Sequence, residues 1–172
     1  TKKYWDFDFC AEITFVVGKT LTTTLKVINT SAFQFEYSCA LHSYYNVSSI
    51  EEIKIEGLQN TAYYNQLDGE NYIQESDLLE VKEATTHHYL NTETDCIIHD
   101  PVFRRRILVS KKGSKVTTVW NPGEETSAII EDMPDDGYQS FVCIEATNAF
   151  DYLIKLNPGE TYETSAIIGL QE

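Results

Sequence analysis

Apolar and polar residues alternate along most of the chain with a period of two. The segment YWDFDFCAEITFVV (residues 4–17) alternates over most of its length, and TLTTTLKVIN (20–29) follows the turn at Gly18-Lys19. Alternation rich in β-branched residues is typical of strands with one buried face, so these two segments predict a hairpin. Helical periodicity is nearly absent, and the pattern predicts an all-β protein.

The rest of the chain shows the same pattern between turn signals. Further strands are predicted at AFQFEYSCAL (32–41), EEIKIEG (51–57), DLLEVKE (77–83), RRRILVS (104–110), KVTTVW (115–120), SFVCIEA (140–146), YLIKLN (152–157) and ETSAIIGL (163–170). About ten strands indicate two packed antiparallel sheets, and no change of composition divides residues 1–172 into more than one domain. The stretch 57–71 is predicted to be a long loop that carries function.

One phrase occurs twice. NPGEETSAII begins at Asn121, and NPGETYETSAII begins at Asn157 with two residues inserted. The segments before the two copies do not match, so two similar units, each a turn followed by a strand, explain the repeat better than a tandem duplication.

Composition and charge limit the classes of molecule that the protein is expected to bind. The 172 residues carry a formal net charge of −14, which argues against nucleic acid and against an anionic membrane surface. A local basic pocket for a small anionic substrate stays compatible with that charge. No apolar run reaches the length of a membrane span, and no signal peptide is visible, so a cytoplasmic protein is expected. The widely spaced cysteines predict neither a disulfide framework nor a metal site: Cys10, Cys39, Cys96 and Cys143.

Among the histidines, His42 is the candidate for chemistry. An apolar strand leads to it, and Tyr44, Tyr45 and Asn46 follow. A satisfied structural histidine is one interpretation, and an imidazole that transfers protons near neutral pH is the other. His87, His88 and His99 lack the spacing of metal ligands and are interpreted as surface residues.

Two carboxylates and one basic run complete the candidates. Glu145 ends an apolar strand, where desolvation would raise its pKa toward that of a useful base. A salt bridge at the edge of the core is the alternative. Asp95 is interpreted as a turn residue on composition alone. The basic run FRRRILV (103–109) is interpreted as a charged strand edge that discourages aggregation.

Several longer segments are similar to one known family. ALHSYYNVSSIEEIKIEGL (40–58) resembles the segment of the hexose-6-phosphate 1-epimerases, relatives of aldose 1-epimerase, that carries their catalytic histidine. TETDCII (92–98) resembles the segment of the same family that contains an Asp-Arg pair. Three further segments of the chain resemble later motifs of that family and occur in the same order: VWNPGEE (119–125), DMPDDGYQSFVCIE (132–145) and LNPGET (156–161).

The resemblance implies an antiparallel β-sandwich of the galactose-mutarotase type and an isomerase that interconverts the α and β anomers of a hexose 6-phosphate, with glucose 6-phosphate as the expected substrate. It implies no cofactor and no metal. His42 would be the general acid, Glu145 the general base, and Asp95 a ligand for a sugar hydroxyl. A sugar or sugar phosphate is the implied partner.

The sequence departs from the family in two respects. Cys96 stands where the family has arginine after the aspartate. Family members are also considerably longer at the N-terminus, so the chain is expected to lack that part of the sandwich and to associate with itself through exposed strand edges. The alternatives are a carbohydrate-binding or regulatory protein without turnover, and a structural sandwich that acts through protein contacts.

Overall fold

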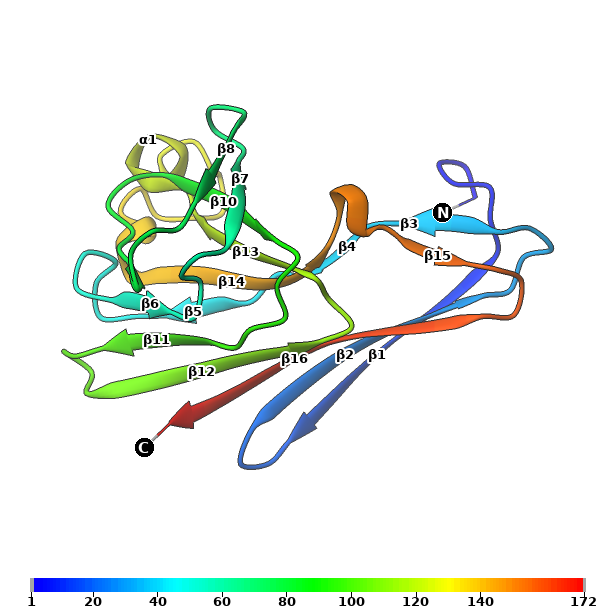
Figure 1. Ribbon diagram of the computed structural model, residues 1–172, viewed down its shortest axis with the longest axis horizontal. Coiled ribbons are helices and arrows are strands. Elements are labelled where there is room, and N and C mark those ends of the chain that lie inside the picture. Colours follow the sequence, from blue (N-terminus) through cyan, green and yellow to red (C-terminus); the bar gives the residue numbers. More distant parts are fainter. Residues whose placement is uncertain (1, 172) are drawn as a thin grey trace.

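The computed structural model describes residues 2–171. Its larger elements are two antiparallel sheets, which lie face to face at one end of the molecule (Figure 1). Within these residues no helix has the length and hydrophobicity needed to cross a membrane. The two packed sheets predicted from the alternating pattern are confirmed.

The first sheet, which we call sheet A, has seven strands. In spatial order they are β1 (Phe9–Val17), β2 (Leu21–Asn29), β16 (Thr161–Gln171), β12 (Arg105–Lys112), β11 (Cys96–Asp100), β6 (Lys54–Glu56) and β9 (Leu78–Leu79). The predicted hairpin is confirmed, because β1 pairs with β2 from Phe9–Asn29 to Val17–Leu21.

The second sheet, sheet C, carries the candidate residues. Its strands are, in order, β4 (Cys39–Leu41), β14 (Phe141–Asn148), β13 (Val116–Asn121), β10 (Thr85–Leu90), β7 (Ala62–Asn65) and β8 (Glu70–Ile73), and β5 (Tyr44–Asn46) also pairs with β14. A separate ribbon of β3 (Phe35–Tyr37) and β15 (Ile154–Leu156) lies at the other end of the molecule. The helical elements are α1 (Gly123–Ser127), η1 (Gly137–Ser140) and η2 (Phe150–Tyr152).

The main hydrophobic core fills the space between the two sheets. Ile55, Ile98 and Ile107 come from sheet A, and Tyr89 and Val119 come from sheet C. Successive side chains of a strand point to opposite faces, so each of these strands also presents a second row of residues away from the core. The sheet C row that faces away from the core holds the candidate site.

Several sequence-based predictions were wrong in detail. The stretch 57–71 is not one long loop, because it contains β7 and the start of β8, which pair as a hairpin. Residues 4–8 do not belong to the first strand, since Trp5 and Phe7 instead pack in an aromatic cluster with Phe9 and Phe35. β12, which holds most of the basic run, pairs on both sides with β11 and β16, so it is not an edge strand.

The two copies of the repeated phrase fold differently. The second copy continues into β16, where Ala166 is buried between β12 and β2. The first copy forms α1 and a turn, and Ile129 is 78% exposed. The interpretation of two turn-then-strand units is therefore correct for the second copy and wrong for the first.

Candidate active site

His42 and Glu145 meet on the outer face of sheet C. β4 and β5 both pair with β14, and His42 lies just after β4 at the level of Glu145. Neighbouring Leu41 and Ala146 pack together on the core side, so the alternation directs His42 and Glu145 to the opposite face. The Nε2 atom of His42 is 3.2 Å from Oε1 of Glu145.

The two side chains differ in their access to water. The Glu145 side chain is 7% exposed, whereas that of His42 is 41% exposed. Burial raises the pKa of Glu145 to about 7, because a charged carboxylate loses its hydration there. Burial also lowers the pKa of His42. A carboxyl group and an imidazole in direct contact titrate as a coupled pair and can share a single proton.

Aromatic rings form one wall of this site. The imidazole of His42 stacks on Tyr44 with 4.8 Å between ring centroids, and Trp120 lies edge-on to it at 5.3 Å. Trp120 also contacts Phe141. These contacts hold the imidazole in one orientation, and exposed aromatic faces of this kind offer apolar contact to the C–H groups of a ligand ring.

A polar row continues from Glu145 across the sheet. Thr118 on β13 lies between Glu145 on β14 and His88 on β10, since it pairs in register with both. Thr118 Oγ1 is 2.9 Å from His88 Nδ1 and 2.9 Å from Thr147 Oγ1. Because His88 Nε2 lies 2.8 Å from Gln66 Oε1, both ring nitrogens are engaged. His88 is therefore half-buried and fixed on the same face as Glu145.

The sequence identified His42 and Glu145 but missed this row. His88 was interpreted as a surface residue because its neighbourhood is polar, and no strand was predicted there. Alternation alone separates it from His87: His87 stacks on Tyr63, which packs against the core, while the next residue faces the other way. Thr85 and Thr86 are β-branched, and that signal could have revealed β10.

Asp95 lies apart from the pair in the other sheet. It is exposed and directly precedes β11, and its backbone carbonyl lies against Gly57. No hydrogen bond or ion pair joins it to His42 or Glu145 in the described part of the chain. Its neighbours Thr94 and Cys96 nevertheless line a small cavity between the sheets together with Glu145. Cys96 itself is 1% exposed, and burial raises the pKa of its thiol to about 12.

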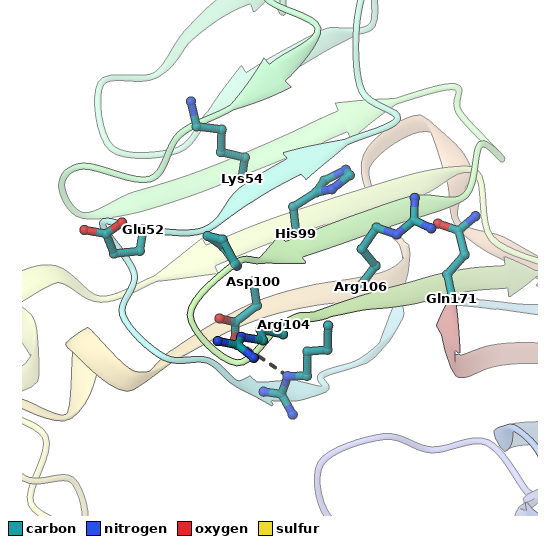
Figure 2. A pocket seen from close by; sticks show the side chains of 9 residues that line it. Glu52, Lys54, His99, Asp100, Arg104, Arg106 and Gln171 are labelled. Carbon is teal, nitrogen blue, oxygen red and sulfur yellow. Dashed lines mark ion pairs between the residues drawn. The ribbon is translucent and has the colours of Figure 1, made fainter.

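A larger open groove of about 480 Å³ lies on the outer face of sheet A, away from His42 and Glu145 (Figure 2). Lys54, His99 and Arg106 are register partners on adjacent strands and line it side by side. Carboxylates share this face with the basic side chains, since His99 lies 2.8 Å from Glu56 and Lys54 lies 2.9 Å from Glu80. The groove is thus a surface of mixed charge, and the proton-transfer geometry lies on sheet C.

Comparison with known proteins identifies the class. The sequence profile of the family described as aldose 1-epimerase matches residues 1–169, and the chain belongs to that family. A Salmonella typhimurium protein, provisionally named a glucose-6-phosphate 1-epimerase, is 36% identical over 87% of this chain and 49% of its own length. A protein from Cenchrus ciliaris with the same provisional name is 28% identical over 93% of this chain and 50% of its own length.

A solved structure agrees with the sequence comparisons. The crystal structure of a Salmonella typhimurium protein provisionally described as a mutarotase superposes with a TM-score of 0.90 at 31% identity, over 99% of this chain and 56% of that one. The fold is therefore the all-β galactose-mutarotase type that the sequence predicted. The chain spans about half the length of the curated relatives it matches.

Proposed function

We propose that this chain carries the acid–base pair of a hexose-6-phosphate 1-epimerase, which interconverts the α and β anomers of a hexose 6-phosphate such as glucose 6-phosphate. The observation that carries the proposal is the contact between the buried carboxyl of Glu145 and the more exposed imidazole of His42. Membership of the aldose 1-epimerase family supports the reaction class. The names of the relatives support the choice of a hexose 6-phosphate.

The geometry suits the chemistry because both reacting oxygens are bonded to the same carbon. Glu145 removes the proton from the hydroxyl on C1, while His42 gives a proton to the ring oxygen. The bond between C1 and the ring oxygen breaks, and an open-chain aldehyde forms. Rotation about the C1–C2 bond presents the other face of the carbonyl group. Reclosure with the proton transfers reversed gives the other anomer and restores both side chains.

Asp95 is proposed as a ligand for a sugar hydroxyl. Support for this role comes from the family resemblance and from membership of the aldose 1-epimerase family. Asp95→Asn keeps the size of the side chain and removes its charge. We expect it to raise KM for the sugar more than it lowers kcat, because it acts in binding. An unchanged KM would remove Asp95 from the site.

The deciding experiment is magnetisation-exchange NMR between the two anomers of glucose 6-phosphate, with the spontaneous rate in the same buffer as the baseline. We expect the chain to accelerate exchange, and His42→Ala and Glu145→Gln each to lower the catalysed rate at least a hundredfold, as loss of a general acid or base does. The matched control is the carboxylate of the second His–Glu contact: Glu56→Gln on sheet A should leave the rate unchanged.

Two results would contradict the proposal. If wild-type protein binds the sugar phosphate without faster exchange, the chain is a carbohydrate-binding protein of the same fold. If exchange is fast but indifferent to both His42→Ala and Glu145→Gln, the catalytic groups lie elsewhere.

A further inference from the structure

The imidazole of His88 is fixed from several sides. Its Nδ1 atom lies 2.9 Å from Thr118 Oγ1, and its Nε2 atom lies 2.8 Å from Gln66 Oε1. Phe150 lies edge-on to the ring with 4.9 Å between centroids, and Tyr64 lies nearly parallel to it at 6.3 Å. Two hydrogen bonds and two aromatic neighbours therefore determine both the position and the plane of this ring.

One of these aromatic neighbours has a strained backbone. Phe150 has a φ of +59°, in the left-handed region that bulky residues rarely adopt. It begins η2 just after β14, the strand that carries Glu145, and its ring contacts both His88 and Tyr64. Strain of this kind persists only where the surrounding structure determines the conformation, and it is common next to functional sites. The turn after β14 thus has a conformational cost at the point where Phe150 meets His88.

The hydrogen bonds define which ring nitrogen carries the hydrogen atom. Burial lowers the pKa of His88 from its ordinary value of 6.5, so the neutral ring predominates at pH 7. A neutral imidazole has one N–H donor and one acceptor nitrogen. Because Gln66 Oε1 can only accept, Nε2 donates to it, and Nδ1 accepts from the hydroxyl of Thr118. The oxygen of Thr118 accepts in turn from the hydroxyl of Thr147, so the chain of hydrogen bonds has one direction.

Gln66 is the replaceable end of this chain. Thr118 and Thr147 are 3% and 5% exposed, whereas Gln66 is exposed. A ligand oxygen can therefore take the place of Gln66 at Nε2 of His88 and leave the buried hydrogen bonds intact. A donor that is held in position before the ligand arrives loses little conformational entropy on binding.

His88 lies in line with the proposed acid–base pair. Thr118 on β13 pairs in register with Glu145 on one side and with His88 on the other, and the three strands are neighbours in sheet C (Figure 1). Neighbouring strands lie about 4.8 Å apart, so the backbones of Glu145 and His88 are roughly 10 Å apart. Trp120, two residues after Thr118, is half-buried on the same face. A hexose with C1 at Glu145 that extends along this row turns its opposite side, with the hydroxyls on C3 and C4, towards His88.

We propose that Nε2 of His88 donates a hydrogen bond to the hydroxyl on C3 or C4 of the hexose, and that His88 is a specificity-determining residue of the site. This inference rests on the proposed function, because it places C1 of the sugar at His42 and Glu145. Thr118 is a positioning residue, because it acts through the imidazole. A site that donates to a substrate hydroxyl discriminates against analogues that lack this hydroxyl.

A cycle of changes in the protein and in the substrate tests the contact. Magnetisation exchange gives kcat/KM for glucose 6-phosphate and for its 2-deoxy, 3-deoxy and 4-deoxy analogues, each corrected for its spontaneous rate. We expect His88→Ala to lower kcat/KM about tenfold for glucose 6-phosphate and for the 2-deoxy sugar, mainly through KM. The 3-deoxy or the 4-deoxy sugar, whichever has lost the partner of His88, should be insensitive to the substitution. Equal losses for all four sugars would overturn the contact.

The matched control is His87→Ala. His87 is the adjacent residue of β10, but it faces the other way and stacks on Tyr63. Its loss should affect all four sugars alike, and urea unfolding of both variants should show how far each changes stability. A dependence on the 3-hydroxyl or 4-hydroxyl that appears equally in His87→Ala and His88→Ala would overturn the assignment to His88.

Two further variants test the chain of hydrogen bonds. Thr118→Val should raise KM about threefold, and Thr118→Ser should restore it, because only the hydroxyl group is needed to hold Nδ1. Gln66→Ala should lower KM, since the sugar no longer has to displace the amide from Nε2 of His88. If Gln66→Ala instead raises KM about tenfold, the amide and not the imidazole binds the sugar, and the proposal is wrong.

NMR of the histidine side chains separates this inference from the proposed reaction. We expect the Nε2 resonance of His88 to shift when glucose 6-phosphate is added, and to shift less with the analogue that lacks its partner hydroxyl. Accelerated exchange with an unshifted His88 resonance would overturn the inference and leave the reaction intact. A shifted resonance without accelerated exchange would support the contact and contradict the reaction, and a chain that does neither would contradict both.

Discussion

At the scale of single residues, the site is a carboxyl group kept from water beside an imidazole. Because the proposed reaction needs one group with a proton and one without, the pair must hold one proton in its active state. Burial raises the pKa of Glu145 to about 7, so the pair loses its last proton near neutral pH. Burial lowers the pKa of His42, so a second proton binds only at lower pH.

The catalysed exchange rate should therefore follow a bell-shaped curve. Its alkaline limb should fall near pH 7, where the pair loses its last proton, and its acid limb should reflect a second proton bound by His42. The measurement is the exchange rate of glucose 6-phosphate, minus the spontaneous rate, across neutral pH. Glucose, which does not titrate there, serves as the control substrate. A rate that climbs steadily into the alkaline range would show that the proton on the pair is not needed.

Burying the carboxyl group of Glu145 costs stability above its unfolded pKa. Its pKa rises from 4.5 to about 7 on folding, so the folded state binds more protons between these values. The free energy of unfolding should thus fall as pH rises through this window. The shift corresponds to about 3 kcal/mol.

Glu145→Gln removes the titrating group and keeps the shape. We expect the variant to be more stable than wild type above pH 7, by up to about 3 kcal/mol, with little difference below the unfolded pKa of 4.5. Urea unfolding at both ends of the window measures this. A difference that does not change with pH would mean that Glu145 is not desolvated in solution.

At the scale of elements, the repeated phrase shows how far local sequence determines structure. Thr-Ser-Ala-Ile-Ile occurs at 126–130 and again at 164–168, yet the first copy forms a helical turn and the second a strand. In the second copy, β2 and β12 lie on both sides and supply backbone partners. Within residues 2–171, no neighbouring strand pairs with the first copy. The neighbouring strands, and not the local sequence, therefore determine whether this phrase forms a strand. The sequence alone does not show which copy has such neighbours.

The repeat also supplies a matched stability test. Ala166 is 2% exposed in the core, whereas the corresponding Ala128 is exposed. Ala166→Asp buries an unpaired charge and should lower the free energy of unfolding by at least about 3 kcal/mol, while Ala128→Asp should change it by less than about 0.5 kcal/mol. Urea unfolding of the two variants provides the comparison. Similar losses would show that the first copy is packed as tightly as the second.

Strand prediction succeeded where one face is apolar and failed where both faces are mixed. β14 follows the predicted segment because its inward residues Val142, Ile144 and Ala146 form an apolar row. β7, β8 and β10 were missed, since Tyr63, His87 and their neighbours use amphipathic side chains to cover the core. Residues His42 and Glu145 could be proposed because each interrupts an apolar strand. Thr118 and His88 become visible only through strand pairing.

At the scale of the whole molecule, net charge acts on the proposed substrate. The chain carries −14, and a sugar phosphate is anionic, so the two repel at long range. The screening length falls from about 30 Å at 0.01 M salt to about 8 Å at physiological ionic strength. Added salt should therefore raise kcat/KM for glucose 6-phosphate and leave that for glucose unchanged. The measurement is magnetisation exchange of both sugars along a salt series at constant pH.

The opposite response would be equally informative about where the phosphate binds. If salt lowers kcat/KM for the phosphate sugar alone, a local cluster of cations must attract it more strongly than the whole chain repels it. The groove on sheet A is the candidate for that cluster, and Arg106→Gln would test it, since Arg106 lines the groove on β12 and lies away from the pair on β14. If Arg106→Gln abolishes the salt effect, the groove on sheet A attracts the phosphate. If the salt effect is unchanged, the attracting cations lie outside the groove.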